Sequence, residues 1–135
     1  MATYRKLLKD KDGNTIIPVT ERDVYSTTEQ VIGQWIDGKP IYRRVFTGTI
    51  TNSANVRVQT SIWTNSPINK IISIGGWMRY STAGVNAFPQ SEGGGEYRIA
   101  YVQSDSHNLM LAVLSASAYT NRPYEIWVDY TKSTD

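Results

Sequence analysis

Hydrophobic and polar residues alternate over strand-length stretches along most of this 135-residue chain. In residues 124–131, Tyr, Ile, Val and Tyr alternate with Glu, Trp, Asp and Thr. A period of two residues is typical of a β-strand with one buried face. Alternating or apolar runs predict strands at Thr15–Val19, Pro40–Ile50, Arg57–Trp63, Lys70–Tyr80, Tyr97–Gln103, Leu109–Leu114 and Tyr124–Thr131. Because polar turn formers separate these runs, we expect an all-β fold, an antiparallel β-sandwich of jelly-roll-like type.

Three segments depart from simple alternation. In Leu109–Leu114 both faces are apolar, which predicts a strand that is central in its sheet or lies beneath a subunit interface. Gly75-Gly76 interrupts a strong strand and indicates a bulge or a close backbone approach. Ser26-x-x-Glu29 followed by Gly33 matches a helix capping box and a glycine C-cap. A short helix is therefore one prediction there, and an extended segment is the alternative.

Two turn motifs organise the first third of the chain. Asp12-Gly13-Asn14 and Asp37-Gly38 each separate short apolar runs, which is a strong hairpin signal. The first motif predicts an N-terminal hairpin spanning Lys6 to Val19. We expect residues 1–34 to form a hairpin or attachment arm and residues 35–135 to form the β-sandwich domain.

The composition fits one ordinary globular domain, with 40% hydrophobic and 19% charged residues. The net charge of +2 and the scattered basic residues do not predict a nucleic-acid or membrane partner. The one adjacent arginine pair, Arg43-Arg44, is expected to face opposite sides of a sheet. The absence of cysteine excludes disulfides and thiolate chemistry. No run approaches the roughly 20 apolar residues that cross a bilayer, and we expect no signal peptide.

Motifs near both ends of the chain resemble a known group of proteins. Residues 12–20 read DGNTIIPVT, residues 25–43 read YSTTEQVIGQWIDGKPIYR, and the chain closes with Ile126–Asp135. These segments resemble minor structural proteins from tail fibres of bacteriophages and prophages of Gram-positive bacteria. The resemblance does not cover the middle of the chain, from about Thr51 to Ser115.

The resemblance implies a non-enzymatic virion protein, made in the host cytoplasm, that acts as a tail-fibre, receptor-binding or adaptor module. It implies a homotrimer whose N-terminal segment docks to other tail proteins, and a host cell-surface glycan as receptor. Nine Tyr and four Trp also supply aromatic surface that one small domain cannot hide, which favours an oligomer. Two alternatives stay open, a free carbohydrate-binding module and a glycan depolymerase.

Catalytic and metal-binding patterns are weak. Asp10, Asp12, Asn14 and Glu21 match positions 1, 3, 5 and 12 of an EF-hand loop, but Thr15 stands where that loop needs glycine. A tight turn between two strands explains the motif better than calcium does. We expect no metal and no cofactor.

An enzyme is also not predicted. His107 is the only histidine and lies in a stretch typical of a surface turn, while no serine has the G-x-S-x-G surroundings of a hydrolase nucleophile. Glycosidases need two carboxyl groups about 5–10 Å apart. Glu125 and Asp129 share a strand face but lie roughly 13 Å apart at a rise of ~3.3 Å per residue.

Loops on a rigid β scaffold commonly carry recognition, and two turn-rich stretches, Ser81–Gly95 and Ser115–Arg122, are expected to share one end of the sandwich. Tyrosine stacks on sugar rings, and Asn and Arg donate hydrogen bonds to sugar hydroxyls. The candidate ligand contacts are therefore Tyr80, Asn86, Tyr119, Asn121 and Arg122.

Overall fold

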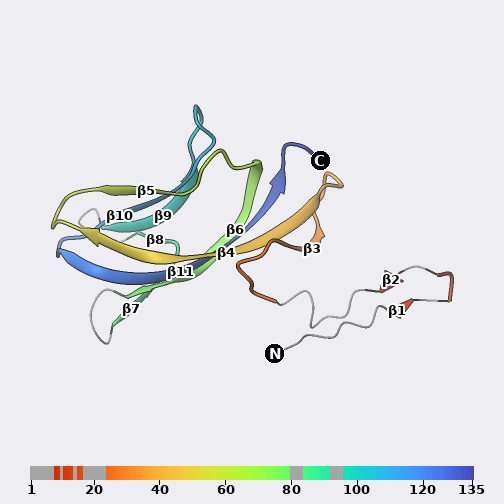
Figure 1. Ribbon diagram of the computed structural model, residues 1–135, viewed down its shortest axis with the longest axis horizontal. Helices are drawn as coiled ribbons and strands as arrows, with labels where there is room; N and C mark the ends of the chain where they lie inside the picture. Colours follow the sequence, from red (N-terminus) through yellow and green to blue (C-terminus); the bar gives the residue numbers. More distant parts are fainter. Residues whose placement is uncertain (1–7, 10, 14, 17–23, 80–83, 92–95) are drawn as a thin grey trace.

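The structure is a computed structural model and describes residues 8–9, 11–13, 15–16, 24–79, 84–91 and 96–135 (Figure 1). The described residues form strands and turns, with no helix among them. The strands are β1 (Leu8–Lys9), β2 (Thr15–Ile16), β3 (Gln30–Gln34), β4 (Pro40–Asn52), β5 (Val58–Trp63), β6 (Ile68–Arg79), β7 (Val85–Ala87), β8 (Gln90–Ser91), β9 (Tyr97–Val102), β10 (Leu109–Leu114) and β11 (Tyr119–Lys132).

Two antiparallel sheets face each other and confirm the predicted all-β sandwich. One sheet has five strands in the order β3-β4-β11-β6-β7, and the other has four in the order β5-β10-β9-β8. The long strands β4, β6 and β11 curve along their length in Figure 1, so the five-stranded sheet curls around the core. β10 lies between β5 and β9, which confirms the central position predicted from its two apolar faces.

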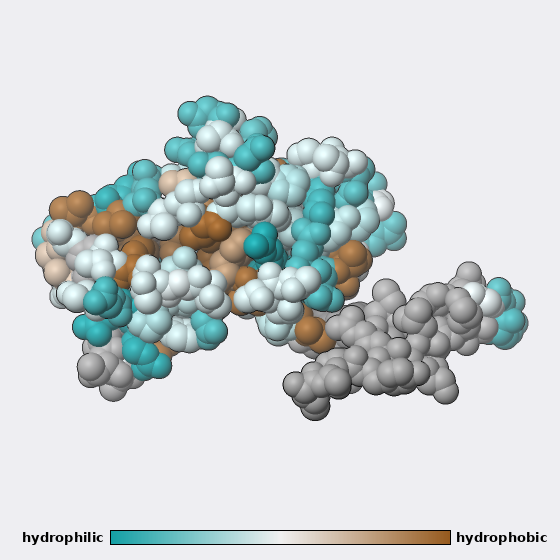
Figure 2. Space-filling model, viewed as in Figure 1, coloured by the Kyte–Doolittle hydropathy of each residue, from teal (hydrophilic) through white to brown (hydrophobic). Residues whose placement is uncertain are grey.

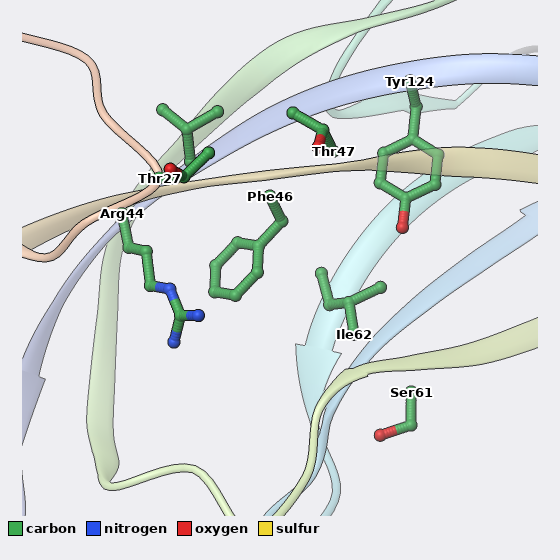
Figure 3. A pocket seen from close by; sticks show the side chains of 8 residues that line it. Thr27, Arg44, Phe46, Thr47, Ser61, Ile62 and Tyr124 are labelled. Carbon is green, nitrogen blue, oxygen red and sulfur yellow. The ribbon is translucent and has the colours of Figure 1, made fainter.

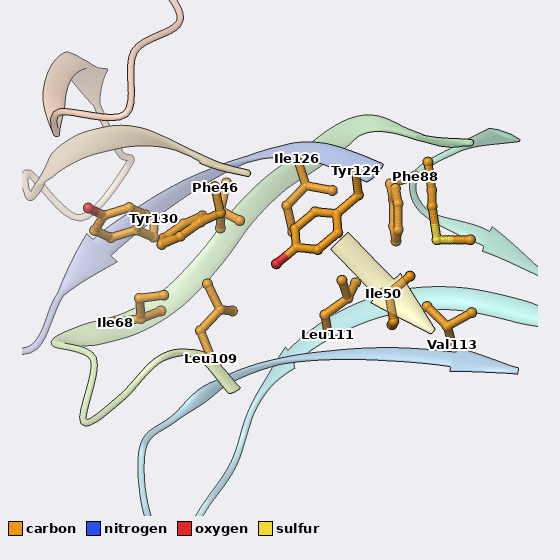
Figure 4. Close-up of a cluster of buried hydrophobic side chains, with 12 residues drawn as sticks. Phe46, Ile50, Ile68, Phe88, Leu109, Leu111, Val113, Tyr124, Ile126 and Tyr130 are labelled. Carbon is orange, nitrogen blue, oxygen red and sulfur yellow. The ribbon is translucent and has the colours of Figure 1, made fainter. Parts of the chain in front are cut away.

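The core lies between the two sheets and depends on the predicted alternation in β11. Tyr124, Ile126, Val128 and Tyr130 all point inward, with at most 6% of each residue exposed. Figure 4 shows their side chains facing those of β10, and Leu111 is among the residues that no solvent reaches. Fully burying one aliphatic side chain of this size contributes about 1.5–3 kcal/mol. The inner faces of β10 and β11 therefore hold the two sheets together.

Both predicted hairpins are present. β1 pairs with β2 and β3 pairs with β4, and the turn residues Gly13 and Gly38 adopt φ values of 84° and 87°. The outer parts of the predicted arm, including Lys6 and Val19, lie outside the described residues. β3 belongs to the five-stranded sheet although it falls on the arm side of the expected boundary at residue 34. The division into arm and sandwich domain itself stays a prediction.

The segment from residue 24 onward is not helical, so the extended alternative is confirmed and the short helix is wrong. The Ser26 hydroxyl accepts a backbone N–H as a capping residue does, but the donor is Thr28, two residues on, at 3.1 Å. The Glu29 carboxylate accepts hydrogen bonds from the Tyr130 hydroxyl and the Lys132 ammonium group instead of turning back to the backbone. Pairing with β4 and contacts with β11 thus override the local helix signal, as tertiary context often does.

Gly75 and Gly76 mark a close approach to β11, one of the two predicted alternatives. The Trp127 indole lies over Gly75, where a Cβ atom would overlap the ring. Gly76 has a φ of 122°, and a Cβ atom there would overlap the Glu125 carbonyl oxygen. The register between β6 and β11 is continuous at these positions, so no bulge is present there.

We predict that Gly76→Ala lowers the free energy of unfolding by about 2–4 kcal/mol, because the new methyl group meets both a positive φ and a backbone oxygen. Chemical denaturation measures this loss. Gly33→Ala is the matched control, since no atom lies within 4 Å of a Cβ placed there. Equal losses in both variants would contradict the close approach.

Candidate functional site

A groove on the outer face of the five-stranded sheet gathers aromatic, carboxylate and hydroxyl side chains. We call it the Trp127 groove, and its volume is about 400 Å³. It is lined by Tyr25, Ser26, Thr27, Val45, Thr47, Gly76, Trp77, Glu125, Ile126 and Trp127.

The strand register places the groove residues side by side. Glu125 of β11 pairs with Thr47 of β4 on one side and with Trp77 of β6 on the other. Adjacent strands lie about 4.8 Å apart, so these three side chains form a row across the sheet. Trp127, two residues further along β11, lies on the same face in the next row.

Tyr25 reaches the groove from the extended segment before β3. The Val45 amide donates a hydrogen bond of 2.9 Å to the Ser26 carbonyl, so this segment continues alongside β4 beyond the end of β3. The Tyr25 ring then meets the Trp127 ring edge to face, with 5.9 Å between centroids and 64° between planes. Tyr25 keeps 54% of its surface exposed. Its ring is therefore available to a ligand.

Arg43 and Asp129 contact the Tyr25 and Trp127 rings from the neighbouring position on the same sheet face. The Arg43 guanidinium lies 4.4 Å from the Tyr25 ring centroid and 4.9 Å from that of Trp127. Asp129 accepts two hydrogen bonds from it, from Nε at 2.7 Å and from Nη2 at 2.9 Å. Their side chains are only 12% and 7% exposed. A bidentate buried pair holds the guanidinium plane in one orientation, and the Tyr25 and Trp127 rings that contact it are held with it.

The lining of the Trp127 groove suits a sugar. Aromatic rings stack on the apolar faces of pyranose rings, while hydroxyl and carboxylate groups bind sugar hydroxyls. The volume falls within the range of roughly 300–1,000 Å³ found for small-ligand sites. Among the described lining residues Glu125 is the one carboxylate. The groove lining thus lacks the carboxyl pair that glycoside hydrolysis requires.

Among the residues expected to contact a ligand, Asn86, Asn121 and Arg122 do not line this groove. Asn86 lies in β7 opposite Met78, and Tyr119, Asn121 and Arg122 belong to the first part of β11. The loop interpretation of Ser115–Arg122 is therefore wrong from Tyr119 onward, because the chain has already entered a strand. Tyr80 lies outside the described residues, as does the side chain of Tyr119.

The start of β11 is irregular at those positions. Its register against β4 shifts between Tyr119 and Arg122, and Asn121 adopts a φ of 50°. The Asn121 amide donates a hydrogen bond to Thr51 Oγ1 at 3.2 Å. Arg122 has a buried Nε without a hydrogen-bond partner in the described structure. The assignment of these residues to a receptor site stays a prediction.

His107 lies in an exposed turn, as its polar surroundings predict. The turn between β9 and β10 projects from the sandwich in Figure 1 and is hydrophilic in Figure 2. His107 has a φ of 56°, and its carbonyl accepts hydrogen bonds from both the amide and the hydroxyl of Ser66. Within the described ranges, no three His, Asp or Glu side chains gather at a point that could hold a metal. No helix long and apolar enough to cross a membrane occurs in the described part of the chain.

Sequence reasoning missed the three aromatic residues of the groove. The period of two in residues 124–131 already placed Trp127 on the face that carries Glu125 and Asp129, and an aromatic residue on a charged face is a usable signal. Trp77 and Tyr25 carried no comparable signal, because only the pairing of β6 and of the segment before β3 brings them to Trp127.

Comparisons of the chain with known protein families, with curated proteins and with solved structures give no match.

We predict that Asp129→Asn lowers the free energy of unfolding by about 3 kcal/mol, because it leaves the Arg43 charge buried without its carboxylate. It should also shift the fluorescence of Trp127 as the edge-to-face contact between Tyr25 and Trp127 loosens. Asp37→Asn is the control, since Asp37 forms an exposed pair with Lys70 at 3.3 Å and such pairs contribute at most about 1 kcal/mol. Denaturation curves followed by tryptophan emission measure both effects. Unchanged stability of Asp129→Asn would show that the pair does not support the groove.

Proposed function

We propose that this protein is a non-enzymatic virion component that binds a host cell-surface glycan through the Trp127 groove. The observation that carries the proposal is the meeting of Tyr25, Trp77 and Trp127 around one exposed carboxylate, Glu125. Rigid aromatic surfaces flanked by hydrogen-bonding groups are typical of sites that recognise sugars.

The virion setting comes from the resemblance of residues 12–20, 25–43 and 126–135 to phage tail-fibre proteins. Such a protein binds its receptor without turnover. A free carbohydrate-binding module would bind the same glycan as a monomer, and a depolymerase would release reducing ends from it. Three measurements on the same sample therefore separate these functions. A glycan-binding oligomer that releases no reducing ends is the virion component, a glycan-binding monomer is the free module, and release of reducing ends identifies the depolymerase.

The first prediction concerns glycan binding. Trp77→Ala should weaken binding of envelope polysaccharide fragments by about tenfold, the loss expected when one stacking ring is removed. Trp35→Ala is the control, because Trp35 lies at the β3–β4 turn and does not line the groove. Isothermal titration calorimetry measures both variants.

A double substitution, Tyr119→Ala with Arg122→Ala, separates the groove from the receptor surface expected from the sequence. Loss of binding in that variant alone, with Trp77→Ala unaffected, would move the receptor site to the start of β11. Unchanged binding in all variants would overturn both assignments.

The second prediction is a homotrimer. The outer face of the four-stranded sheet supports it, because Ile99 and Tyr101 of β9 form a partly exposed apolar strip there, beside Met110 and Ala112 of β10, which are already buried within the chain. Light scattering should return three times the chain mass of 15.2 kDa. Ile99→Glu should reduce that mass to one chain by placing a charge in the strip. Thr49→Glu, on the outer face of the other sheet, should leave it unchanged. A single-chain mass for the unmodified protein at micromolar concentration would refute the trimer.

A further inference from the structure

A second cavity, which adjoins the Trp127 groove at β4, contains an arginine that has no hydrogen bond or ion pair with any described residue. It opens between β4 of one sheet and β5 of the other and has a volume of about 390 Å³. We call it the Arg44 cleft. Figure 3 shows the side chains of Arg44, Phe46 and Tyr124 pointing from the five-stranded sheet toward Ile62 of β5, whereas the Ser61 hydroxyl points to the other side of that strand.

The guanidinium of Arg44 rests on aromatic rings. It lies 4.8 Å from the ring centroid of Phe46 and 4.7 Å from that of Trp63. No hydrogen bond or ion pair joins it to any described residue, whereas its sequence neighbour Arg43 has the carboxylate of Asp129. The described residues that line the cleft include no Asp or Glu. An arginine is always charged and has five N–H donors, so its free donors face a site with no competing anion.

Tyr124 adds a second unpartnered group. Only 6% of this residue is exposed, and its hydroxyl has no hydrogen-bond partner among the described residues. The ring packs against Gly48, where a Cβ atom would lie 2.7 Å from the hydroxyl oxygen. Burial raises the pKa of the Tyr124 hydroxyl, which therefore stays protonated and can donate. The hydroxyl is not among the described buried polar atoms that lack a partner, so solvent reaches it at the cleft and a ligand can bind it.

We propose that the Arg44 cleft binds an oxyanion, a carboxylate or phosphate, carried on a sugar or other small polyol. The Arg44 guanidinium and the Tyr124 hydroxyl bind the anionic group. The Thr27 hydroxyl binds the polyol, and the apolar surfaces of Phe46 and Ile62 contact its carbon skeleton. A forked guanidinium matches the geometry of both oxyanions. The cleft adjoins the Trp127 groove, since Thr27, Val45 and Thr47 line both, but Arg44, Phe46 and Tyr124 line only the cleft. The proposal rests on these three residues and does not depend on the function proposed for the groove.

The test is calorimetric titration of the full chain with two matched pairs of ligands. Glucuronate is compared with glucose, and glycerol phosphate with glycerol, so each pair differs in the anion. The unmodified protein should bind at least one anion more tightly than its neutral counterpart. Arg44→Gln should weaken that binding by about 10–100-fold, the range of a charge-assisted hydrogen bond. Tyr124→Phe should weaken it by up to about tenfold.

Lys70→Gln is the control for loss of one positive charge, since Lys70 is exposed on β6 away from the cleft. Its anion affinity should equal that of the unmodified protein. Preference for glucuronate identifies a carboxylate ligand, and preference for glycerol phosphate identifies a phosphate. Equal affinity of Arg44→Gln and the unmodified protein, or no saturable binding of either anion at millimolar concentration, would overturn the proposal. Binding of neutral polysaccharide by Arg44→Gln, measured in parallel, tests the Trp127 groove separately and shows that the variant is folded.

Discussion

The structure depends on β11, the strand that carries both the core and the candidate groove. It pairs with β4 on one side and with β6 on the other over most of its 14 residues. A strand bonded on both sides cannot slip by one residue without turning every side chain to the opposite face. The register is restricted further at Gly75 and Gly76, because any side chain at position 75 would overlap Trp127 and one at position 76 would overlap the β11 backbone. The inner face of β11 therefore stays in the core, and its outer face keeps Glu125 and Trp127 in the groove.

The adjacent arginines show how one strand serves two different surfaces. Arg43 points outward, donates hydrogen bonds to Asp129 and contacts the Tyr25 and Trp127 rings of the Trp127 groove. Arg44 points inward and lies on Phe46 and Trp63 at the mouth of the Arg44 cleft. Both guanidinium groups rest on aromatic rings, but only the first faces a carboxylate. This difference separates an arginine that supports a site from one that is free to bind a ligand.

Glu29 joins the first described segment of the sandwich to the end of β11. Its carboxylate binds the Tyr130 hydroxyl and the Lys132 ammonium group, and Lys132 in turn lies 4.2 Å from the Tyr42 ring centroid. Tyr42 donates a hydrogen bond of 2.7 Å to Asp135. These contacts link residues about a hundred positions apart in the chain. They fix the segment that presents Tyr25 to the groove, although that segment has a weak strand signal of its own.

The sequence by itself determined the fold class, most strands, both Asp-Gly hairpins and the two faces of β11, because these depend on local turn chemistry and on a period of two residues. It located the turn between β3 and β4 but not the extent of β3, and it did not reveal β7 or β8, which are short and have few apolar residues. It left a short helix at Ser26 open beside an extended segment and placed a loop at Tyr119, where local preferences differ from the pairing with β4. The groove and the cleft were decided only by the tertiary structure. Their residues come from strands and segments far apart in the chain, and only strand register and the packing of two sheets bring them together.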